Sequence, residues 1–286
     1  MTPSETIGST LGAVAAALAG AGVDDARRRA RRLVAAALDV SAAEVLAERD
    51  RAISQGHAER VAELLRRTLA HEPLSRILAL REFWGLEFVL SADTLDPRPE
   101  TETIVEAINA RLPKRSDPYR FLDLGTGSGC LLLALLSEFP AATGLGVDRV
   151  FGAAAVARRN ADRLGLAARA RFAVGDWAEA LIGHFDAVVA NPPYIASADI
   201  AGLPREVRDF DPRMALDGGA DGLNAYRRVS VDLTRLLKPS GLFACEIGQG
   251  QDSEVAALIA AHGLVIEEIV PDLAGILRCV VGRRPS

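Results

Sequence analysis

Apolar residues recur at three- and four-residue steps through residues 6–80, which is the spacing of amphipathic helices. Two such faces are formed by Leu33, Val34, Ala37 and Leu38, and by Val61, Leu64, Leu65, Thr68 and Leu69. Ser41 stands three residues before Glu44, the spacing of a capping box at a helix start. Pro73 is expected to stop the last of these helices. The pattern predicts a small all-helical N-terminal domain over residues 1–80.

The pattern changes over residues 81–98, where strand-forming residues surround Gly85. Phe83, Trp84 and Phe88 are of types enriched in strands, which favours a short hairpin or extended linker. Two prolines then stiffen the approach to a helix expected over Glu102–Leu112. We therefore predict a hairpin linker at residues 81–98, followed by a second domain of residues 99–286.

Strand and helix patterns alternate from Arg120 onward. The expected strands are Phe121–Asp123, Gly144–Val147, Arg171–Val174, Phe185–Ala190, Leu242–Ile247, Val265–Val270 and Leu277–Val281. The expected helices include Cys130–Glu138, Ala153–Leu164 and Val255–His262. Near-continuous apolar strands separated by helices indicate an α/β fold with a parallel sheet covered on both faces. Only Pro271–Gly275 joins the last two strands, so we expect them to be antiparallel.

Composition narrows the class of protein. Hydrophobic residues make up 49% and charged residues 25% of the 286, as in ordinary globular proteins. The net charge of −5 argues against a protein that binds nucleic acid stably. No apolar run reaches the roughly 20 residues that cross a bilayer, and Met1–Thr10 lacks the positive charge of a secretory signal. A cytoplasmic location is expected. The three cysteines and four histidines show no metal-ligand spacing, so no metal is predicted.

A glycine-rich loop follows the first strand of the α/β region and opens a helix. Its residues are Asp123, Leu124, Gly125, Thr126, Gly127, Ser128 and Gly129. Glycines let a ligand approach the backbone, and the helix start offers free N–H groups. Asp123 suits the amino group of S-adenosylmethionine, and Asp148, at the next strand end, suits its ribose hydroxyls. The Gly-x-Gly-x-Gly spacing differs from the dinucleotide fingerprint, so NAD(P) and a purely structural turn are the lesser alternatives.

Asp176 and Trp177 follow the third strand on the same side of the predicted sheet. The carboxylate of Asp176 is expected to accept from an adenine amino group, while the indole of Trp177 packs on the ring. An exposed acid beside a core tryptophan is the alternative. The predicted cofactor-binding set thus comprises the loop residues, Asp148, this pair and Asn191.

The sequence Asn191-Pro192-Pro193-Tyr194 follows the strand Phe185–Ala190, where ligand crevices of open α/β sheets lie. Two prolines fix the backbone and remove two donors, leaving the Asn191 side-chain oxygen and the Pro192 carbonyl as acceptors. Such a pair suits a planar –NH2 group, which Tyr194 would cover. The two oxygens would also stabilise positive charge on a nitrogen that is being methylated. Asn191, Pro192 and Tyr194 are the predicted catalytic residues, and Pro193 joins them in substrate binding.

Together these motifs resemble the glutamine N5-methyltransferases of peptide-chain release factors, the HemK/PrmC family. Arg81–Leu86 and Asp96–Glu102 are similar to the linker signature of that family, and the helical N-terminal region is similar to its release-factor-binding domain. The resemblance implies a class I, Rossmann-like methyltransferase domain with a seven-stranded sheet. It also implies methyl transfer from S-adenosylmethionine to the glutamine of a Gly-Gly-Gln loop in release factors. Ile276–Cys279 departs from the more polar ending that the family suggests.

Other functions and weaker signals remain open. The same acceptor geometry serves enzymes that methylate adenine amines in DNA or RNA, and a non-catalytic module could keep the cofactor fold. The segment Ile195–Asp221 is long for a loop and is expected to wall the substrate groove, with a mobile surface loop as the alternative. Glu246 is expected to be solvated, although a substrate contact is the alternative. Arg27–Arg32 is expected to be a solvated helix face, or else a docking patch.

Overall fold

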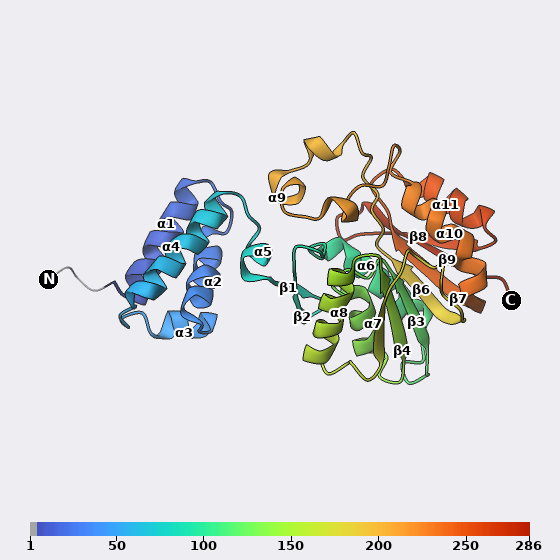
Figure 1. Cartoon of the computed structure of the whole chain (residues 1–286), viewed down its shortest axis with the longest axis horizontal. Coiled ribbons are helices and arrows are strands. Elements are labelled where there is room, and N and C mark those ends of the chain that lie inside the picture. The colour runs from blue at the N-terminus through green and yellow to red at the C-terminus, as the bar shows by residue number, and fades with distance from the viewer. Residues whose placement is uncertain (1–4) are drawn as a thin grey trace. The chain divides into compact units, whose positions relative to one another are not determined.

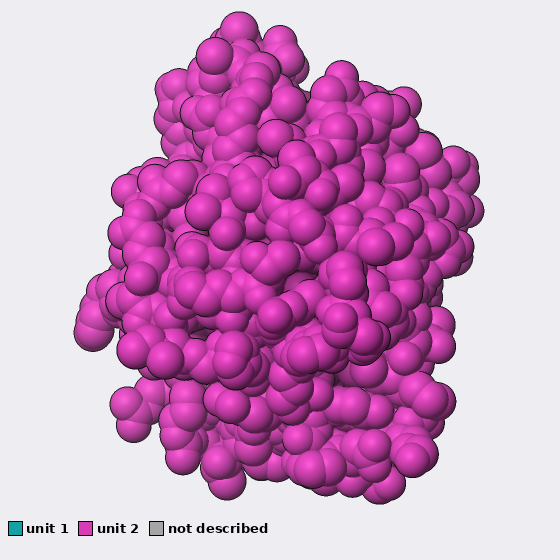
Figure 2. All heavy atoms as spheres, turned by 90° about the vertical axis from the view of Figure 1, so that its right-hand side faces the viewer, with its two compact units in different colours: residues 1–79 teal, residues 80–286 magenta. Residues whose placement is uncertain are grey.

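The computed structural model describes residues 5–286, and the chain divides into two compact units, residues 1–79 and 80–286. Residues 1–4 of the predicted N-terminal domain lie outside the described residues. The helices of the first unit are α1 (Ile7–Gly20), α2 (Ala26–Leu38), α3 (Ala42–Ala47), α4 (Gln55–Leu69) and α5 (Leu74–Leu78) (Figure 1). The face drawn in Figure 2 belongs to the second unit.

Side-chain caps and an apolar core determine the helices of the first unit. The Ser41 hydroxyl accepts the Glu44 backbone N–H at 3.1 Å, and the Glu44 carboxylate accepts the Ser41 N–H at 2.7 Å. The predicted capping box is therefore confirmed. The prediction for Pro73 was wrong, because α4 already ends at Leu69 and Pro73 precedes α5 instead. Proline is tolerated at a helix start, where its missing N–H has no partner to lose.

The arginine run Arg27–Arg32 lies on α2. Arg27, Arg28 and Arg32 are exposed, which matches a largely solvated face. The run also borders a hollow of about 570 Å³ between the helices of this unit. The hollow is lined by Leu11, Gly12, Ala15, Arg27, Arg28, Arg31, Leu46 and Arg49.

The second unit opens with an antiparallel hairpin of β1 (Leu80–Phe83) and β2 (Leu86–Val89). Trp84 and Gly85 connect the strands with φ of 54° and 68°, as the tight type I′ turn requires. Buried Asn160 fixes the end of the hairpin: its Oδ1 accepts the Val89 N–H at 2.8 Å, and its Nδ2 donates to the Val89 carbonyl at 3.0 Å. The same Nδ2 donates to the Ser128 carbonyl at 2.9 Å, so one side chain joins the hairpin to the glycine-rich loop.

A seven-stranded sheet forms the centre of the second unit (Figure 1). Its strands are β3 (Arg120–Leu124), β4 (Thr143–Asp148), β5 (Ala170–Val174), β6 (Phe185–Ala190), β7 (Leu237–Glu246), β8 (Val265–Pro271) and β9 (Leu277–Arg283). The longer helices are α6 (Glu102–Arg111), α7 (Cys130–Glu138), α8 (Phe151–Arg163), α10 (Asn224–Leu236) and α11 (Asp252–Ala261). The strands and helices expected from the pattern are all present, with ends shifted by a few residues at most positions.

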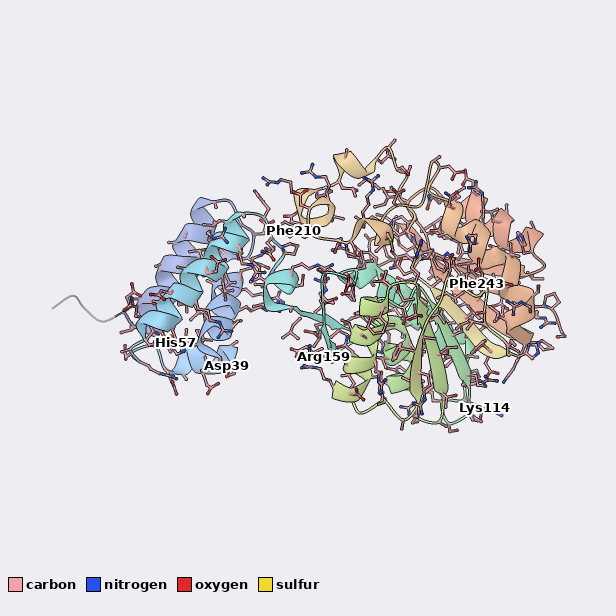
Figure 3. The ribbon with its side chains drawn as sticks, in the orientation of Figure 1. Asp39, His57, Lys114, Arg159, Phe210 and Phe243 are labelled. Carbon is pink, nitrogen blue, oxygen red and sulfur yellow. The ribbon has the colours of Figure 1, made fainter. Side chains whose placement is uncertain are left out.

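The strand order is β5-β4-β3-β6-β7-β9-β8, and β9 is antiparallel to both β7 and β8. The predicted α/β class, seven-stranded sheet and antiparallel closing pair are confirmed. Alternate strand residues face opposite apolar clusters: Ala187 and Val189 pack with α6 and α7, whereas Val188 packs with α10 and α11. Phe243 on β7, labelled in Figure 3, belongs to the second of these clusters. The parallel strands β3 and β6 are neighbours, with β4 and β5 on one side of this pair and β7 on the other, so the strand order switches between them and a crevice opens at their carboxyl ends.

Replacing Asn160 by alanine should lower the free energy of unfolding by about 2 kcal/mol or more, because three backbone groups of Val89 and Ser128 lose their partner. Urea denaturation followed by circular dichroism measures the change. The matched control is Asn109→Ala, since Asn109 Oδ1 is buried without a hydrogen bond. Equal losses in the two variants would show that the Asn160 bridge contributes nothing specific.

Candidate functional site

A cavity of about 780 Å³ lies at the carboxyl ends of β3, β4, β5 and β6. Most of the residues predicted as site residues line it: Asp123, Gly125, Thr126, Gly127, Ser128, Asp148, Asp176, Trp177, Asn191 and Pro193. Three others, Gly129, Pro192 and Tyr194, do not line it. The loops that follow four neighbouring strands thus meet around one crevice, as the parallel arrangement of those strands requires.

The glycine-rich loop has a backbone that other residues would adopt only with strain. Gly125, Gly127 and Gly129 have φ of 74°, 55° and 82°. The Gly127 N–H donates to Asp148 Oδ2 at 2.9 Å, which holds the loop against the end of β4. Gly129 is buried, and a Cβ there would lie 3.1 Å from the Cβ of Ala157, so it lets α7 and α8 pack closely.

Asp123 is an ionisable group buried at the end of β3, with an exposure of 1%. Its Oδ2 accepts the Thr126 hydroxyl at 2.6 Å, whereas Oδ1 has no hydrogen-bond partner among the described residues. Burial raises the pKa of Asp123 to about 7, although the Thr126 hydrogen bond opposes that shift. The Ser128 hydroxyl is likewise buried without a partner. Two polar groups on the cavity are therefore left to be satisfied by a ligand.

Asp148 and the Asp176–Trp177 pair lie farther along the cavity wall. Asp148 Oδ1 accepts the Val150 N–H at 2.9 Å, and burial raises the pKa of this carboxyl group. Asp176 is partly exposed and pairs with Arg228 at 3.1 Å, so it has an anchoring partner that the sequence did not reveal. The Trp177 indole lies 3.4 Å from where a Gly125 Cβ would be, which is van der Waals contact, so this indole packs against the glycine-rich loop.

The segment Asn191-Pro192-Pro193-Tyr194 leaves β6 at the rim of the cavity. Asn191 Nδ2 donates to Thr101 Oγ1 at 3.0 Å, and no partner for Asn191 Oδ1 is found among the described residues. Pro192 is buried, while Pro193 reaches the cavity. The Tyr194 hydroxyl donates to Glu246 Oε1 at 3.2 Å. Asn191 thus lines the cavity with a side-chain oxygen that has no hydrogen-bond partner among the described residues.

The prediction that Glu246 is solvated was wrong: the residue is only 2% exposed. It ends β7, and its Oε2 accepts the Thr101 hydroxyl at 2.5 Å. Burial raises the pKa of Glu246 to about 6, against the lowering effect of hydrogen bonds from Thr101 and Tyr194. Thr101 begins the α6 region and lines the cavity, but a lone threonine between prolines and a helix gives no sequence signal of this role.

The closing strands and the cysteines lie close to the site. Cys245 and Cys279 are buried, whereas Cys130 is half-buried and lines the cavity. In the ladder between β7 and β9, Glu246 is the partner of Cys279. The charge of Arg278 helps to lower the pKa of Glu246. The less polar sequence Ile276–Cys279 therefore still forms the start of β9, which pairs with the end of β7 next to Glu246.

The segment 195–221 contains short helices and is held by a half-buried ion pair between Arg98 and Asp211. Its helices are η2 (Ile200–Gly202), α9 (Arg205–Arg208) and η3 (Arg213–Ala215). Asp211, 8% exposed, accepts from Arg98 Nη2 at 2.5 Å and from the Asp96 N–H at 3.3 Å. Arg213 and Met214 line the cavity. The end of the segment, from Pro212 to Asp217, thus contributes to the cavity wall, whereas Arg205 and Arg208 of α9 are exposed.

Neither a metal-ligand cluster nor a membrane-spanning helix is found in the described part of the chain. Across residues 5–286, His, Cys, Asp and Glu side chains form no group of three that would hold a metal ion. Every helix in the described part of the chain is too short or too polar to cross a membrane.

The strand order, the reversed last strand and the cavity between β3 and β6 define a Rossmann-like methyltransferase. A methyltransferase from Pyrococcus furiosus shares this fold with a TM-score of 0.52 and 14% identity, covering 80% of this chain and 100% of that one. The profile of the PrmC N-terminal domain matches residues 10–78, and that of the Methyltransferase small domain matches residues 81–203.

Curated relatives extend over nearly the whole chain. The release factor glutamine methyltransferase of Rhodospirillum rubrum is 52% identical over 264 residues, which are 92% of this chain and 81% of that protein. The protein of the same name from Bradyrhizobium diazoefficiens is 44% identical over 283 residues, which are 98% of this chain and 95% of that protein. The chain belongs to the release factor glutamine methyltransferase family.

Asp211→Ala should loosen the segment 195–221, because Arg98 and the Asp96 N–H lose their shared acceptor. We expect trypsin to cut at Arg205, Arg208 or Arg213 several times faster than in the parent protein. Gel densitometry over time measures the rate. The matched control is Asp209→Ala, which removes an exposed acid that pairs with Arg208 at 2.7 Å. Cleavage that is no faster in Asp211→Ala than in this control would contradict the anchoring role.

Proposed function

We propose that the protein transfers a methyl group from S-adenosylmethionine to the side-chain amide nitrogen of the glutamine in the Gly-Gly-Gln motif of release factors. The observation that carries the proposal is the position of Asn191, which lines the same cavity as the glycine-rich loop and whose Oδ1 has no partner among residues 5–286. The relatives that match along the chain bear the name of this activity. Such a substrate would place the enzyme in the cytoplasm, where translation ends.

The cavity offers groups that fit each part of S-adenosylmethionine. The free Oδ1 of Asp123 suits the cationic amino group, and the loop N–H groups with Ser128 suit the carboxylate. Asp148 suits the ribose hydroxyls, since each of its oxygens keeps a lone pair beyond the one given to a backbone N–H. Asp176 and Trp177 suit the adenine. The bare Gly125 leaves the space that a close ligand needs.

The substrate amide would be held by oxygen acceptors on a rigid backbone. Asn191 Oδ1 and the Pro192 carbonyl each accept one proton of the –NH2 group, and the ring of Tyr194 shields it. Asn191 Nδ2 and the Tyr194 hydroxyl are already engaged with Thr101 and Glu246, so both side chains are fixed before the substrate arrives. Fixed acceptors cost little reorganisation during the reaction.

S-adenosylmethionine supplies an electrophilic methyl group on sulfur and departs as a neutral thioether. The amide nitrogen would use its lone pair to form the new N–C bond as the S–CH3 bond breaks, and the strongly acidic N-methylated cation would then release one N–H proton to solvent as the product leaves. The two acceptor oxygens stabilise the positive charge that develops on nitrogen. Alignment of nitrogen and methyl carbon in a site that excludes water supplies most of the remaining acceleration.

The helical unit is the proposed binding element for the body of the release factor, on the ground that it matches the PrmC N-terminal domain. The rival activity, methylation of adenine amines in nucleic acid, would use the same acceptors. The net charge of −5 weighs against it.

Incubation with radiolabelled S-adenosylmethionine and either release factor, DNA or ribosomal RNA tests the proposal. We expect label in the tryptic peptide that contains Gly-Gly-Gln. Label in nucleic acid, or binding of the cofactor without any transfer, would overturn it.

Asn191→Ala should lower kcat on release factor by about 100-fold or more, because a charge-stabilising acceptor is lost. Cofactor affinity, measured by calorimetry, should change less than threefold. Matching losses of both would mean that Asn191 mainly shapes the cofactor pocket.

Cofactor binding should weaken as the pH falls through about 7, because the raised pKa of Asp123 leaves its carboxyl group protonated there. A protonated acid cannot pair with the ammonium group. With a pKa of about 7, affinity should be about fivefold higher at pH 7 than at pH 6. Calorimetry at the two pH values measures the difference. Asp123→Asn should bind more weakly and lose this dependence, whereas Asp176→Asn should keep it; an unchanged pH dependence in Asp123→Asn would refute the assignment.

A further inference from the structure

Glu246 lies behind Asn191 as the end point of a chain of hydrogen bonds. Asn191 Nδ2 donates to Thr101 Oγ1 at 3.0 Å, and the Thr101 hydroxyl donates to Glu246 Oε2 at 2.5 Å. Both Thr101 and Glu246 are almost fully buried, with exposures of 1% and 2%. The Tyr226 hydroxyl donates to the backbone carbonyl of Glu246 at 3.0 Å and fixes the end of β7 from the side of α10.

The chemistry of these groups gives the chain of hydrogen bonds one direction. An ionised carboxylate accepts hydrogen bonds and donates none, so Thr101 must be the donor in its contact with Glu246. A hydroxyl carries a single proton, which leaves only its lone pairs for Asn191. The side-chain amide of Asn191 must therefore turn its –NH2 toward Thr101 and its oxygen away.

We propose that Thr101 and Glu246 are positioning residues that orient the Asn191 side chain so that Oδ1, not Nδ2, faces the substrate. The proposal rests on the proposed function and deepens it by accounting for the choice of an –NH2 acceptor. With the amide reversed, two N–H donors would face each other, and the substrate amide would lose one of its two acceptors. With the observed orientation, a glutamate carboxylate in place of glutamine would meet an oxygen and be rejected.

The same chain of hydrogen bonds strengthens Oδ1 as an acceptor. Hydrogen bonds in series polarise one another, and here the series ends on a negative charge shielded from water. The Tyr194 hydroxyl donates to the other oxygen of Glu246 at 3.2 Å, so this carboxylate orients two residues of the tetrapeptide. Thr101 and Glu246 have no direct role in bond formation; their effect passes through Asn191.

Thr101→Val removes the hydroxyl with little change in volume and should separate orientation from packing. We expect kcat on release factor to fall by about 10-fold or more, with cofactor affinity changed less than twofold. Thr101→Ser keeps the hydroxyl and should retain most of the activity. Thr103→Val is the matched control, since Thr103 is also buried but does not line the cavity; its kcat should stay within twofold of the parent.

An activity-independent measurement reports the orientation directly. The side-chain amide signal of Asn191 in nitrogen-15 NMR spectra can be assigned by its absence from Asn191→Asp protein. One of its protons should be protected from solvent exchange in the parent and in Thr101→Ser, and unprotected in Thr101→Val.

The inference is overturned if Thr101→Val keeps its kcat, if Thr101→Ser loses as much as Thr101→Val, or if the Asn191 amide protons exchange equally in both variants. A parent enzyme that labels no release factor would refute the proposed function, and the exchange measurement would still decide the orientation of Asn191.

Discussion

A buried carboxylate is unstable unless hydrogen-bond donors surround it. The arrangement of the whole site follows from the donors that surround Glu246. Its side chain receives hydroxyl hydrogen bonds from Thr101 and Tyr194, which lie 145 and 52 residues away in sequence. The start of α6, the end of β6 and the end of β7 are thereby joined at one buried point. Asn191, attached to the same network, is held by the fold before any ligand is present.

At the glycine-rich loop, in contrast to the site around Glu246, buried polar groups of the cavity have no hydrogen-bond partner. Asp123 Oδ1 and the Ser128 hydroxyl are buried and without partners among the described residues, beside a loop whose glycines have positive φ. Unpaired groups cost free energy in the folded protein, and a ligand that pairs with them recovers it. Around Glu246 the hydrogen bonds are formed within the protein and orient Asn191. Beside the glycine-rich loop, a bound cofactor would supply the missing hydrogen-bond partners.

Much of this architecture could be predicted from local sequence. Buried parallel strands are apolar along their length, so β3 through β7 and the glycine, aspartate and Asn-Pro-Pro-Tyr segments that follow them could be located by pattern alone. Contacts between residues that are distant in sequence could not be predicted in this way. Thr101 and Asp211 carry no local signal, and Glu246 was taken for a solvated acid because its partners are remote in sequence. Pro73 was misassigned because the same residue suits the stop and the start of a helix.

The central claim is that two oxygens on the end of β6 hold the amide that is methylated. A crystal structure with the demethylated cofactor and a Gly-Gly-Gln peptide tests it most directly. The account predicts the glutamine amide nitrogen at about 3 Å from both Asn191 Oδ1 and the Pro192 carbonyl oxygen. A glutamine bound elsewhere, or with its amide oxygen rather than its nitrogen toward these acceptors, would contradict it.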